Sequence, residues 1–220
     1  MKLKNILSVI SIVILGGLMT MSLSACGLNK DSRAWIEKNR VSDIYKVYPT
    51  KNPEDLFKVF PDGFHITQAY VDENGRAIHM NLEGDPKTKM LTGELIQNPN
   101  LEGSKKIGDV IYNKGKFQFS NMQTTVDWPI DGFLFQNLTI NQKFLDSLTE
   151  KDHGYNSQNG SFYINYKLDD SKIKSLLGVE NTKITIFGIT GYGKDYFSRT
   201  VSFDFSNDIS FTETIERLNK

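Results

Sequence analysis

Cysteine is almost absent from this sequence: the 220 residues contain one, Cys26, against fourteen phenylalanines and nine tyrosines. A single thiol cannot close a disulfide within the chain, so burial of apolar surface has to hold the fold together. Aromatic side chains bury large areas, and their number here is sufficient for that purpose. The sequence therefore predicts a domain that is stabilised by a hydrophobic core.

An excess of positive charge is also missing, because 26 basic side chains are balanced by 26 acidic ones. Proteins that bind nucleic acid or anionic lipid through charge need a basic surface. We therefore expect no nucleic-acid partner.

Catalytic and metal-binding patterns are scarce as well. There is no Gly-x-Ser-x-Gly nucleophile motif, and the stretch Gly191 to Lys194 lacks the spacing of a phosphate-binding loop. His65 and His79 lie about 13 Å apart in the hairpin predicted below, at ~3.3 Å per residue, which is too far for one zinc ion. We expect no catalytic residue, no metal and no cofactor. An alternative hypothesis is a hydrolase, which would need His153 brought near a serine and a carboxylate.

The lone cysteine stands at the end of an apolar run from Ile6 to Leu23, which follows Lys2 and Lys4. A basic start, a short apolar core and small residues before a cut site are typical of a signal peptide. A retained transmembrane helix is the alternative, because the run is about long enough to span a bilayer.

The motif Leu23-Ser24-Ala25-Cys26 resembles the lipobox of bacterial lipoproteins. The resemblance implies cleavage between Ala25 and Cys26, and a diacylglyceryl group on the Cys26 thiol. Membrane lipid would then be a covalent partner, and the protein would be anchored at the extracellular face of the cell membrane. We expect a signal peptide over residues 1–25, a lipidated tether over 26–32 and one domain over 33–220.

The domain begins with two predicted helices. Apolar residues follow a helical period from Arg33 until Pro49 ends the pattern. A second, short helix starts at Asn52 and Pro53, which combine a capping side chain with a first-turn proline, and Pro61 closes it.

Alternating apolar residues then predict a hairpin around Asp72 to Gly75. A two-residue loop would set apolar against polar side chains, whereas a three-residue loop from Glu73 to Gly75 pairs Tyr70 with Ile78 and Ile66 with Leu82. We choose the three-residue loop. A second hairpin sets Val110 and Tyr112 against Phe119 and Phe117.

The remaining elements follow from the same patterns. They are a strand over 133–140, a helix capped by Asn141, a polar surface loop over 149–160, a strand with Phe162, Ile164, Tyr166 and Leu168 facing the core, a helix over 169–177 that ends at Gly178, strands over 183–189 and 199–205, and an edge strand over 209–211. Hairpins without long parallel crossovers indicate an α+β fold. We expect a single domain, mainly antiparallel β-sheet, with the two N-terminal helices and the short helices packed on it.

Three segments carry a resemblance to a known family: 48–57 (YPTKNPEDLF), 88–93 (TKMLTG) and 166–170 (YKLDD). Together with the lipobox, and in this order, they resemble the staphylococcal tandem-type lipoproteins. The chain departs from that family in lacking its Gly-Thr-Trp segment after Asp55 and its lysine-rich character. The resemblance implies a role at the bacterial surface, in host contact and immune stimulation.

Trp128 lies in a polar, proline-containing stretch, where it is either a buried anchor or a side chain that contacts a partner. The leading hypothesis is a non-enzymatic surface lipoprotein that acts as an interaction module, with a host or envelope protein as partner. The alternative is a carrier of lipid or another hydrophobic ligand, which would need an interior left partly empty.

Overall fold

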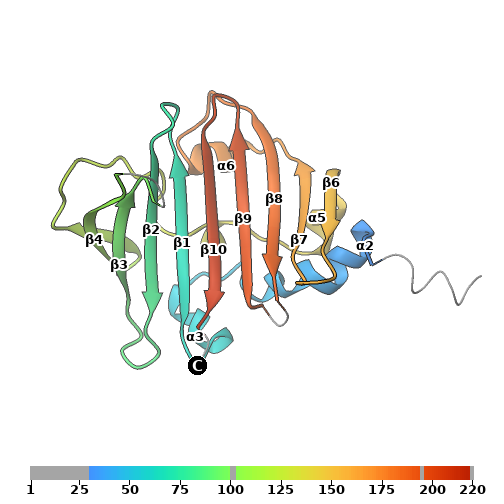
Figure 1. The fold of residues 1–220 in the computed structure, drawn as a ribbon, viewed down its shortest axis with the longest axis horizontal. Helices are drawn as coiled ribbons and strands as arrows, with labels where there is room; N and C mark the ends of the chain where they lie inside the picture. The colour runs from blue at the N-terminus through green and yellow to red at the C-terminus, as the bar shows by residue number, and fades with distance from the viewer. Residues whose placement is uncertain (1–29, 100–102, 194–195, 219–220) are drawn as a thin grey trace, which may run out of the picture.

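The computed structural model describes residues 30–99, 103–193 and 196–218. Within this part of the chain, ten strands form one antiparallel sheet with short helices on one face (Figure 1). The fold is α+β and mainly β, as predicted. The strands are β1 (Phe64–Val71), β2 (Ala77–Gly84), β3 (Leu91–Gln97), β4 (Lys105–Asn113), β5 (Lys116–Ser120), β6 (Thr149–Tyr155), β7 (Phe162–Lys167), β8 (Ile184–Tyr192), β9 (Ser198–Phe205) and β10 (Ser210–Arg217).

The strand order is β5-β4-β3-β2-β1-β10-β9-β8-β7-β6, so the sheet consists of two five-stranded meanders. They meet where β1 pairs with β10 along its whole length. The first and last strands of the chain are therefore central, and β5 and β6 lie at opposite edges. The connection from β5 to β6 consequently has to cross one face of the sheet, and it carries residues 121–148 over it.

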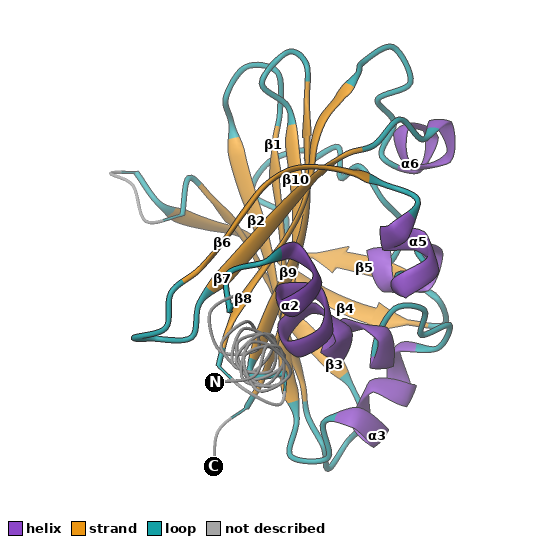
Figure 2. Ribbon diagram, turned by 90° about the vertical axis from the view of Figure 1, so that its right-hand side faces the viewer, coloured by secondary structure: helices purple, strands orange, loops and turns teal. Residues whose placement is uncertain are grey.

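Helical segments cover that same face, as Figure 2 shows for α2, α3, α5 and α6. The N-terminal helical run changes type along its length. The helical elements are α2 (Arg33–Ile36), a π-helical turn (Glu37–Val41), a 3₁₀ turn (Ser42–Lys46), a second 3₁₀ turn (Pro53–Asp55), α3 (Leu56–Val59), α4 (Leu134–Asn137), α5 (Gln142–Asp146) and α6 (Ser171–Leu176). Helices this short are not stable alone, so packing on the sheet has to maintain them.

The first hairpin has the predicted register, with Ile66 opposite Leu82 and Tyr70 opposite Ile78. Gly75 adopts a left-handed conformation, with φ of 75°, as the three-residue loop requires. The second hairpin is also confirmed, because Val110 pairs with Phe119 and Tyr112 with Phe117. The helix caps predicted at Asn141 and Gly178 are present too.

The prediction of a strand over residues 133–140 is wrong, because this stretch contains the helical turn α4. Its first two backbone N–H groups donate to the buried carboxylate of Glu213, from Leu134 at 2.8 Å and from Phe135 at 3.1 Å. An acceptor from the other end of the chain thus satisfies groups that a strand would have paired with a neighbour.

The polar surface loop predicted over residues 149–160 is also wrong in its first half, which forms the edge strand β6. β6 pairs on one side only, with β7, so it carries little apolar alternation. The edge strand predicted over 209–211 is instead the central strand β10, which extends to Arg217. Glu213 occupies a core-facing position of β10 and interrupts the apolar pattern there.

The hydrophobic core lies between the sheet and the helices. Large rings that are at most 1% exposed occupy it, among them Phe64, Phe133, Phe135, Phe187 and Phe203. Phe133 and Phe135 stack with their centroids 4.8 Å apart, and Phe187 and Phe203 stack at 5.2 Å. Side chains therefore occupy the space in which a carrier would hold its ligand.

The two faces of β7 provide a test of this arrangement. Ile164 is fully buried, whereas Asn165 faces outward and donates to Asp152 at 2.8 Å. Ile164→Ala should lower the free energy of unfolding by about 2–5 kcal/mol through the cavity it leaves. Asn165→Ala should cost less than about 1 kcal/mol. Urea unfolding measures both, and equal losses would contradict the assignment of the faces.

Candidate functional site

Ala25 and Cys26, the predicted cleavage and lipidation residues, lie outside the described residues. None of the helices within residues 30–99, 103–193 and 196–218 has the length and hydrophobicity that a bilayer span requires. The lipid anchor is therefore still a prediction from the sequence.

Trp128 packs on the inner face of the sheet. Its ring lies 6.4 Å from Tyr70 and 6.3 Å from Phe211, centroid to centroid, and its Nε1 donates to Gln68 Oε1 at 3.2 Å. This is the position expected of an anchor beneath the crossing segment. Contact with a partner through Trp128 stays a prediction.

Two of the histidines are held apart by the confirmed hairpin register, with His65 opposite Glu83 and His79 opposite Ala69. The part of the chain that the structure describes contains no group of three His, Cys, Asp or Glu side chains arranged to bind a metal ion.

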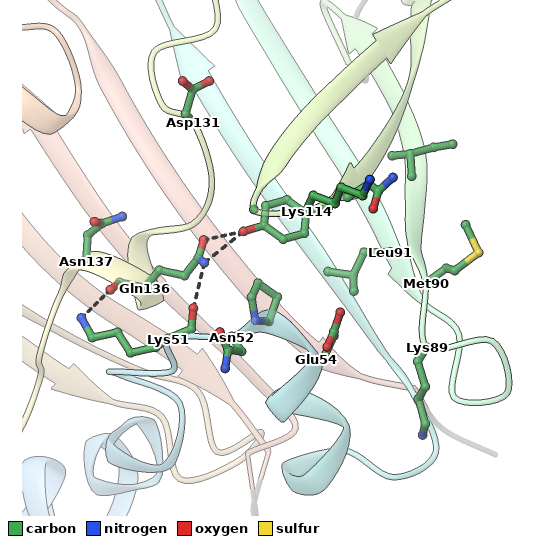
Figure 3. A pocket seen from close by; sticks show the side chains of 15 residues that line it. Lys51, Asn52, Glu54, Lys89, Met90, Leu91, Lys114, Asp131, Gln136 and Asn137 are labelled. Atoms are coloured by element: carbon green, nitrogen blue, oxygen red, sulfur yellow. Dashed lines mark hydrogen bonds between the residues drawn. The ribbon is translucent and has the colours of Figure 1, made fainter.

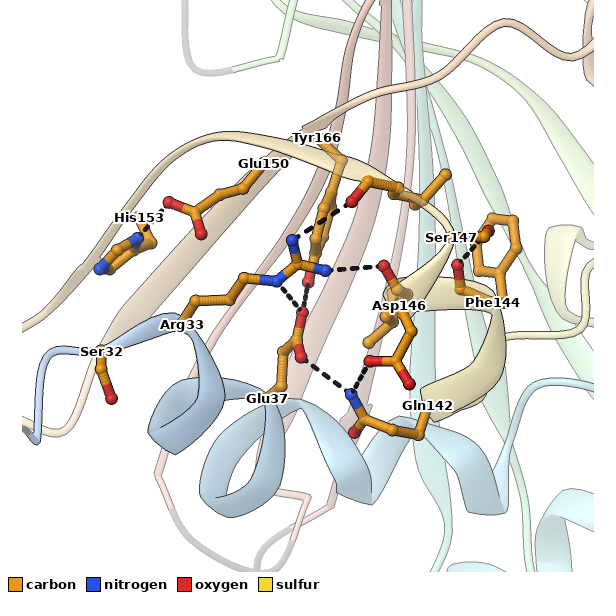
Figure 4. Close-up of polar contacts among 12 residues, drawn as sticks. Ser32, Arg33, Glu37, Gln142, Phe144, Asp146, Ser147, Glu150, His153 and Tyr166 are labelled. Atoms are coloured by element: carbon orange, nitrogen blue, oxygen red, sulfur yellow. Dashed lines mark hydrogen bonds and ion pairs between the residues drawn. The ribbon is translucent and has the colours of Figure 1, made fainter.

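The third histidine, His153, lies in β6 and bridges two acceptors, of which Glu150 is drawn in Figure 4. Its Nδ1 lies 2.6 Å from Glu150 Oε1, and its Nε2 lies 2.6 Å from the carbonyl oxygen of Asp31. Both ring nitrogens can donate at once only when the imidazole is protonated. The hydrogen bond to Glu150 raises the pKa of His153 accordingly. Neither nitrogen is free to accept a proton from a serine, as the hydrolase hypothesis would require.

A polar cluster around Glu37 joins the N-terminal helical run to the sheet (Figure 4). The buried Glu37 carboxylate accepts from Arg33 Nε at 2.8 Å, from the Tyr166 hydroxyl at 2.9 Å and from Gln142 Nε2 at 2.9 Å. Burial and the Glu37 charge raise the pKa of Tyr166, which therefore stays a donor. Arg33 also donates to the carbonyl oxygen of Leu145 at 2.7 Å, at the end of α5. Each charged group in the cluster has partners, which indicates a structural role.

The carboxylate of Glu213 is also buried, and like that of Glu37 it accepts hydrogen bonds at both oxygens. Its Oε1 accepts from the Tyr48 hydroxyl at 2.8 Å, and its Oε2 accepts from Gln68 Nε2 at 2.8 Å. With the two N–H groups of α4, four donors in total bind this side chain. Burial raises the pKa of Glu213 and that of Tyr48. The arrangement fixes α4 against β10 and β1.

The position of α4 in turn sets the side chain of Gln136. Its Nε2 donates to the carbonyl oxygen of Lys51 at 3.0 Å and to the Tyr112 hydroxyl at 3.0 Å, and Lys51 Nζ donates back to the Gln136 carbonyl at 2.9 Å (Figure 3). Gln136 thus joins the chain before α3 to the crossing segment and to β4.

Beside Gln136 lies a hollow of about 600 Å³, which we call the amide pocket (Figure 3). Four segments far apart in sequence line it: 51–54, 89–91, 111–115 and 131–137. The lining residues are Lys51, Asn52, Pro53, Glu54, Lys89, Met90, Leu91, Ile111, Tyr112, Asn113, Lys114, Gly115, Asp131, Gln136 and Asn137. The volume is in the range of pockets that bind small molecules.

The side chains around the amide pocket differ from the buried clusters in their hydrogen bonding. Asn52, Asn113 and Lys114 are exposed and form no side-chain hydrogen bond or ion pair with another described residue. Asn137 uses its amide nitrogen, which donates to the Phe133 carbonyl at 3.0 Å, and keeps its oxygen available. The fold makes little use of these groups, so they are available to a ligand.

A broader hollow of about 1000 Å³ lies on the outer face of the sheet, mainly across β1 to β4. Many of its polar groups are paired across the strands. Lys106 binds Asp109 at 2.6 Å and Glu94 at 3.3 Å, and Thr67 donates to Asn81 at 3.1 Å. The amide pocket is therefore the better candidate for a binding site.

The sequence patterns do not predict the amide pocket. They indicate Asn52 only as a helix-capping residue, and its side chain caps nothing in the structure. They indicate Tyr112 only as a hairpin residue, and it does pair with Phe117 in the hairpin of β4 and β5. No local pattern connects the four segments, because the path of the sheet and the Glu213 bonds bring them together.

A scan against protein-family models and a search of curated protein sequences both return no match for this chain. The resemblance to tandem-type lipoproteins therefore rests on the motifs in the sequence.

The His153 bridge predicts how stability depends on pH. The folded pKa is raised above 6.5, so the bridge contributes fully below about pH 6.5, and its contribution is lost as the pH rises through the folded pKa. His153→Gln should therefore destabilise the protein most at low pH, and the wild type and the variant should converge at higher pH. Urea unfolding between pH 5.5 and 9 measures this, at about half-unit steps chosen to resolve a histidine titration.

His65→Gln is the matched control, because His65 is exposed on the outer face. It should keep the pH profile of the wild type. A constant offset between wild type and His153→Gln at every pH would contradict a protonated bridge.

Proposed function

We propose that this protein is a lipid-anchored, non-enzymatic binding domain on the extracellular face of a bacterial membrane, where it contacts a macromolecule of the envelope or the host. The anchor follows from the Leu23–Cys26 motif and the apolar run before it. The resemblance to the tandem-type lipoproteins supports the same location and a role in host contact.

The binding role is supported by a contrast in hydrogen bonding between the buried carboxylates and the side chains around the amide pocket. Glu37 and Glu213 are saturated by partners within the domain, whereas Asn52, Asn113 and Lys114 at the amide pocket are left unbonded by the described residues. Buried polar groups need partners for stability, while exposed unpaired groups around a hollow cost the fold nothing and can bind a ligand.

Binding is better supported than transport of a hydrophobic ligand. The interior is occupied by fully buried rings, and the amide pocket has amide and charged groups around its opening. A site for an acyl chain would instead be lined mainly by apolar side chains.

The proposal predicts that Cys26→Ala abolishes incorporation of labelled palmitate in a bacterium that processes lipoproteins. Two acyl chains should hold the wild type in the membrane permanently, since one myristoyl chain alone binds with K of only about 10⁴ M⁻¹. The variant should appear either as an uncut precursor or as a released product, both without label.

Ser32→Ala is the control, because it changes a serine outside the lipobox and leaves Cys26 in place. It should be labelled like the wild type. Equal labelling of the wild type and Cys26→Ala would contradict the lipoprotein assignment.

A further inference from the structure

We propose that the amide pocket binds a sugar that carries an acetamido group, as one unit of an oligosaccharide. This inference rests on the proposed function in taking the amide pocket as the contact site, and it names the chemical class of the ligand. Three properties of the lining carry it: the free amides, the apolar floor and the balance of charge.

The free amides match the groups of such a sugar. A side-chain amide presents a carbonyl acceptor and an NH₂ donor, so it can bind the N–H and the C=O of an acetamido group or the two functions of a hydroxyl. Asn52 and Asn113 offer both groups, and Asn137 offers its oxygen. These residues come from the chain before α3, the β4–β5 turn and α4, so the three amides belong to separate segments of the pocket lining.

The floor of the pocket is apolar. Leu91 is 2% exposed, Pro53 is buried and the Tyr112 ring is half-buried. Met90, 48% exposed, extends this surface at the edge. A pyranose has one face of C–H groups, and an acetamido group ends in a methyl, so both can pack on such a floor while the hydroxyls reach the amides above.

The balance of charge argues against a strongly ionic ligand. Lys51, Lys89 and Lys114 are largely offset by Glu54 and Asp131, which leaves a net charge of 3 − 2 = +1 on the lining. Two of these lysines are also engaged elsewhere, since Lys51 donates to the Gln136 carbonyl and Lys89 lies over the Phe57 ring at 4.6 Å. A neutral, hydroxyl-rich ligand fits this lining better than a polyphosphate or a polycation.

The test is titration calorimetry of the full-length protein, extracted in detergent, with two trisaccharides. Chitotriose carries an acetamido group on every ring, and cellotriose is its counterpart with hydroxyls in those positions. Chitotriose should bind at least about tenfold more tightly, as expected for the loss of paired amide hydrogen bonds. Asn113→Ala should weaken chitotriose binding about tenfold for the same reason.

Asn181→Ala is the matched control, because Asn181 is an exposed asparagine outside the pocket lining that forms no side-chain hydrogen bond with another described residue. It should bind chitotriose like the wild type. Asn113 is exposed at a turn, so Asn113→Ala should have the same melting temperature as the wild type. Circular dichroism measures this and checks that the variant is folded.

Three results would overturn the inference: no binding of chitotriose, equal binding of both trisaccharides, or equal loss in Asn113→Ala and Asn181→Ala. A second arm compares retention on purified peptidoglycan with retention on a host-type glycan ending in N-acetylglucosamine, which assigns the source of the sugar. If palmitate labels Cys26 and chitotriose does not bind, the sugar inference alone fails. If chitotriose binds and palmitate does not label, the anchor alone fails.

Discussion

The carboxylate of Glu213 lies in the middle of the apolar core, and the arrangement of the domain depends on satisfying it. An unpaired carboxylate in such a place would cost several kcal/mol or more, so donors have to surround it. They come from Tyr48 just after the N-terminal helical run, from Gln68 on β1 and from the two N–H groups that open α4. One side chain on the last strand thereby fixes three segments that are distant in sequence. Because α4 carries Gln136, the same bonds set the geometry of the amide pocket.

Two further polar contacts fasten the N-terminal run to the sheet, and each includes a buried charged side chain, Glu37 in one and Arg199 in the other. Glu37 binds Tyr166 on β7, and Asp43 binds Arg199 on β9 at 3.0 Å. The run is short, and its helical type changes from α to π to 3₁₀, so intrinsic propensity contributes little to it. These polar contacts specify where it docks, while the apolar contacts of Ile36, Val41 and Ile44 supply burial. In the proposed function the tether leads from the lipid anchor into this run, which these bonds hold on the sheet.

Much of the sheet could be predicted from the sequence, because its strands alternate cleanly and its turns contain the required glycines. The register of the first hairpin followed from pairing Ile66 with Leu82. The errors lie where long-range contacts decide the structure. Glu213 interrupts the apolar alternation of β10. Its hydrogen bonds to the N–H groups of Leu134 and Phe135 stabilise a helical turn where the sequence predicts a strand.

The edge strand β6 and the amide pocket were missed for related reasons. β6 has a single strand neighbour, so its sequence carries no clear alternation. The pocket residues, such as Asn52 and Asn113, are polar loop residues that any surface could contain. Only the topology of the sheet and the bonds of Gln136 bring them to one place.

We propose that Cys26 holds the domain at the outer face of the membrane, with the amide pocket open to the surroundings. Since Cys26 is the only thiol in the chain, thiol labelling can test both halves of this claim at once. Lys116 is exposed and pairs with Asn113 beside the pocket, so Lys116→Cys would place a second thiol at its edge. Intact bacteria would be treated with a membrane-impermeant maleimide. We predict that Lys116→Cys is labelled and that the wild type, whose only thiol is acylated, is not labelled even after lysis. Labelling of the wild type at Cys26, or labelling of Lys116→Cys only after lysis, would contradict this proposal.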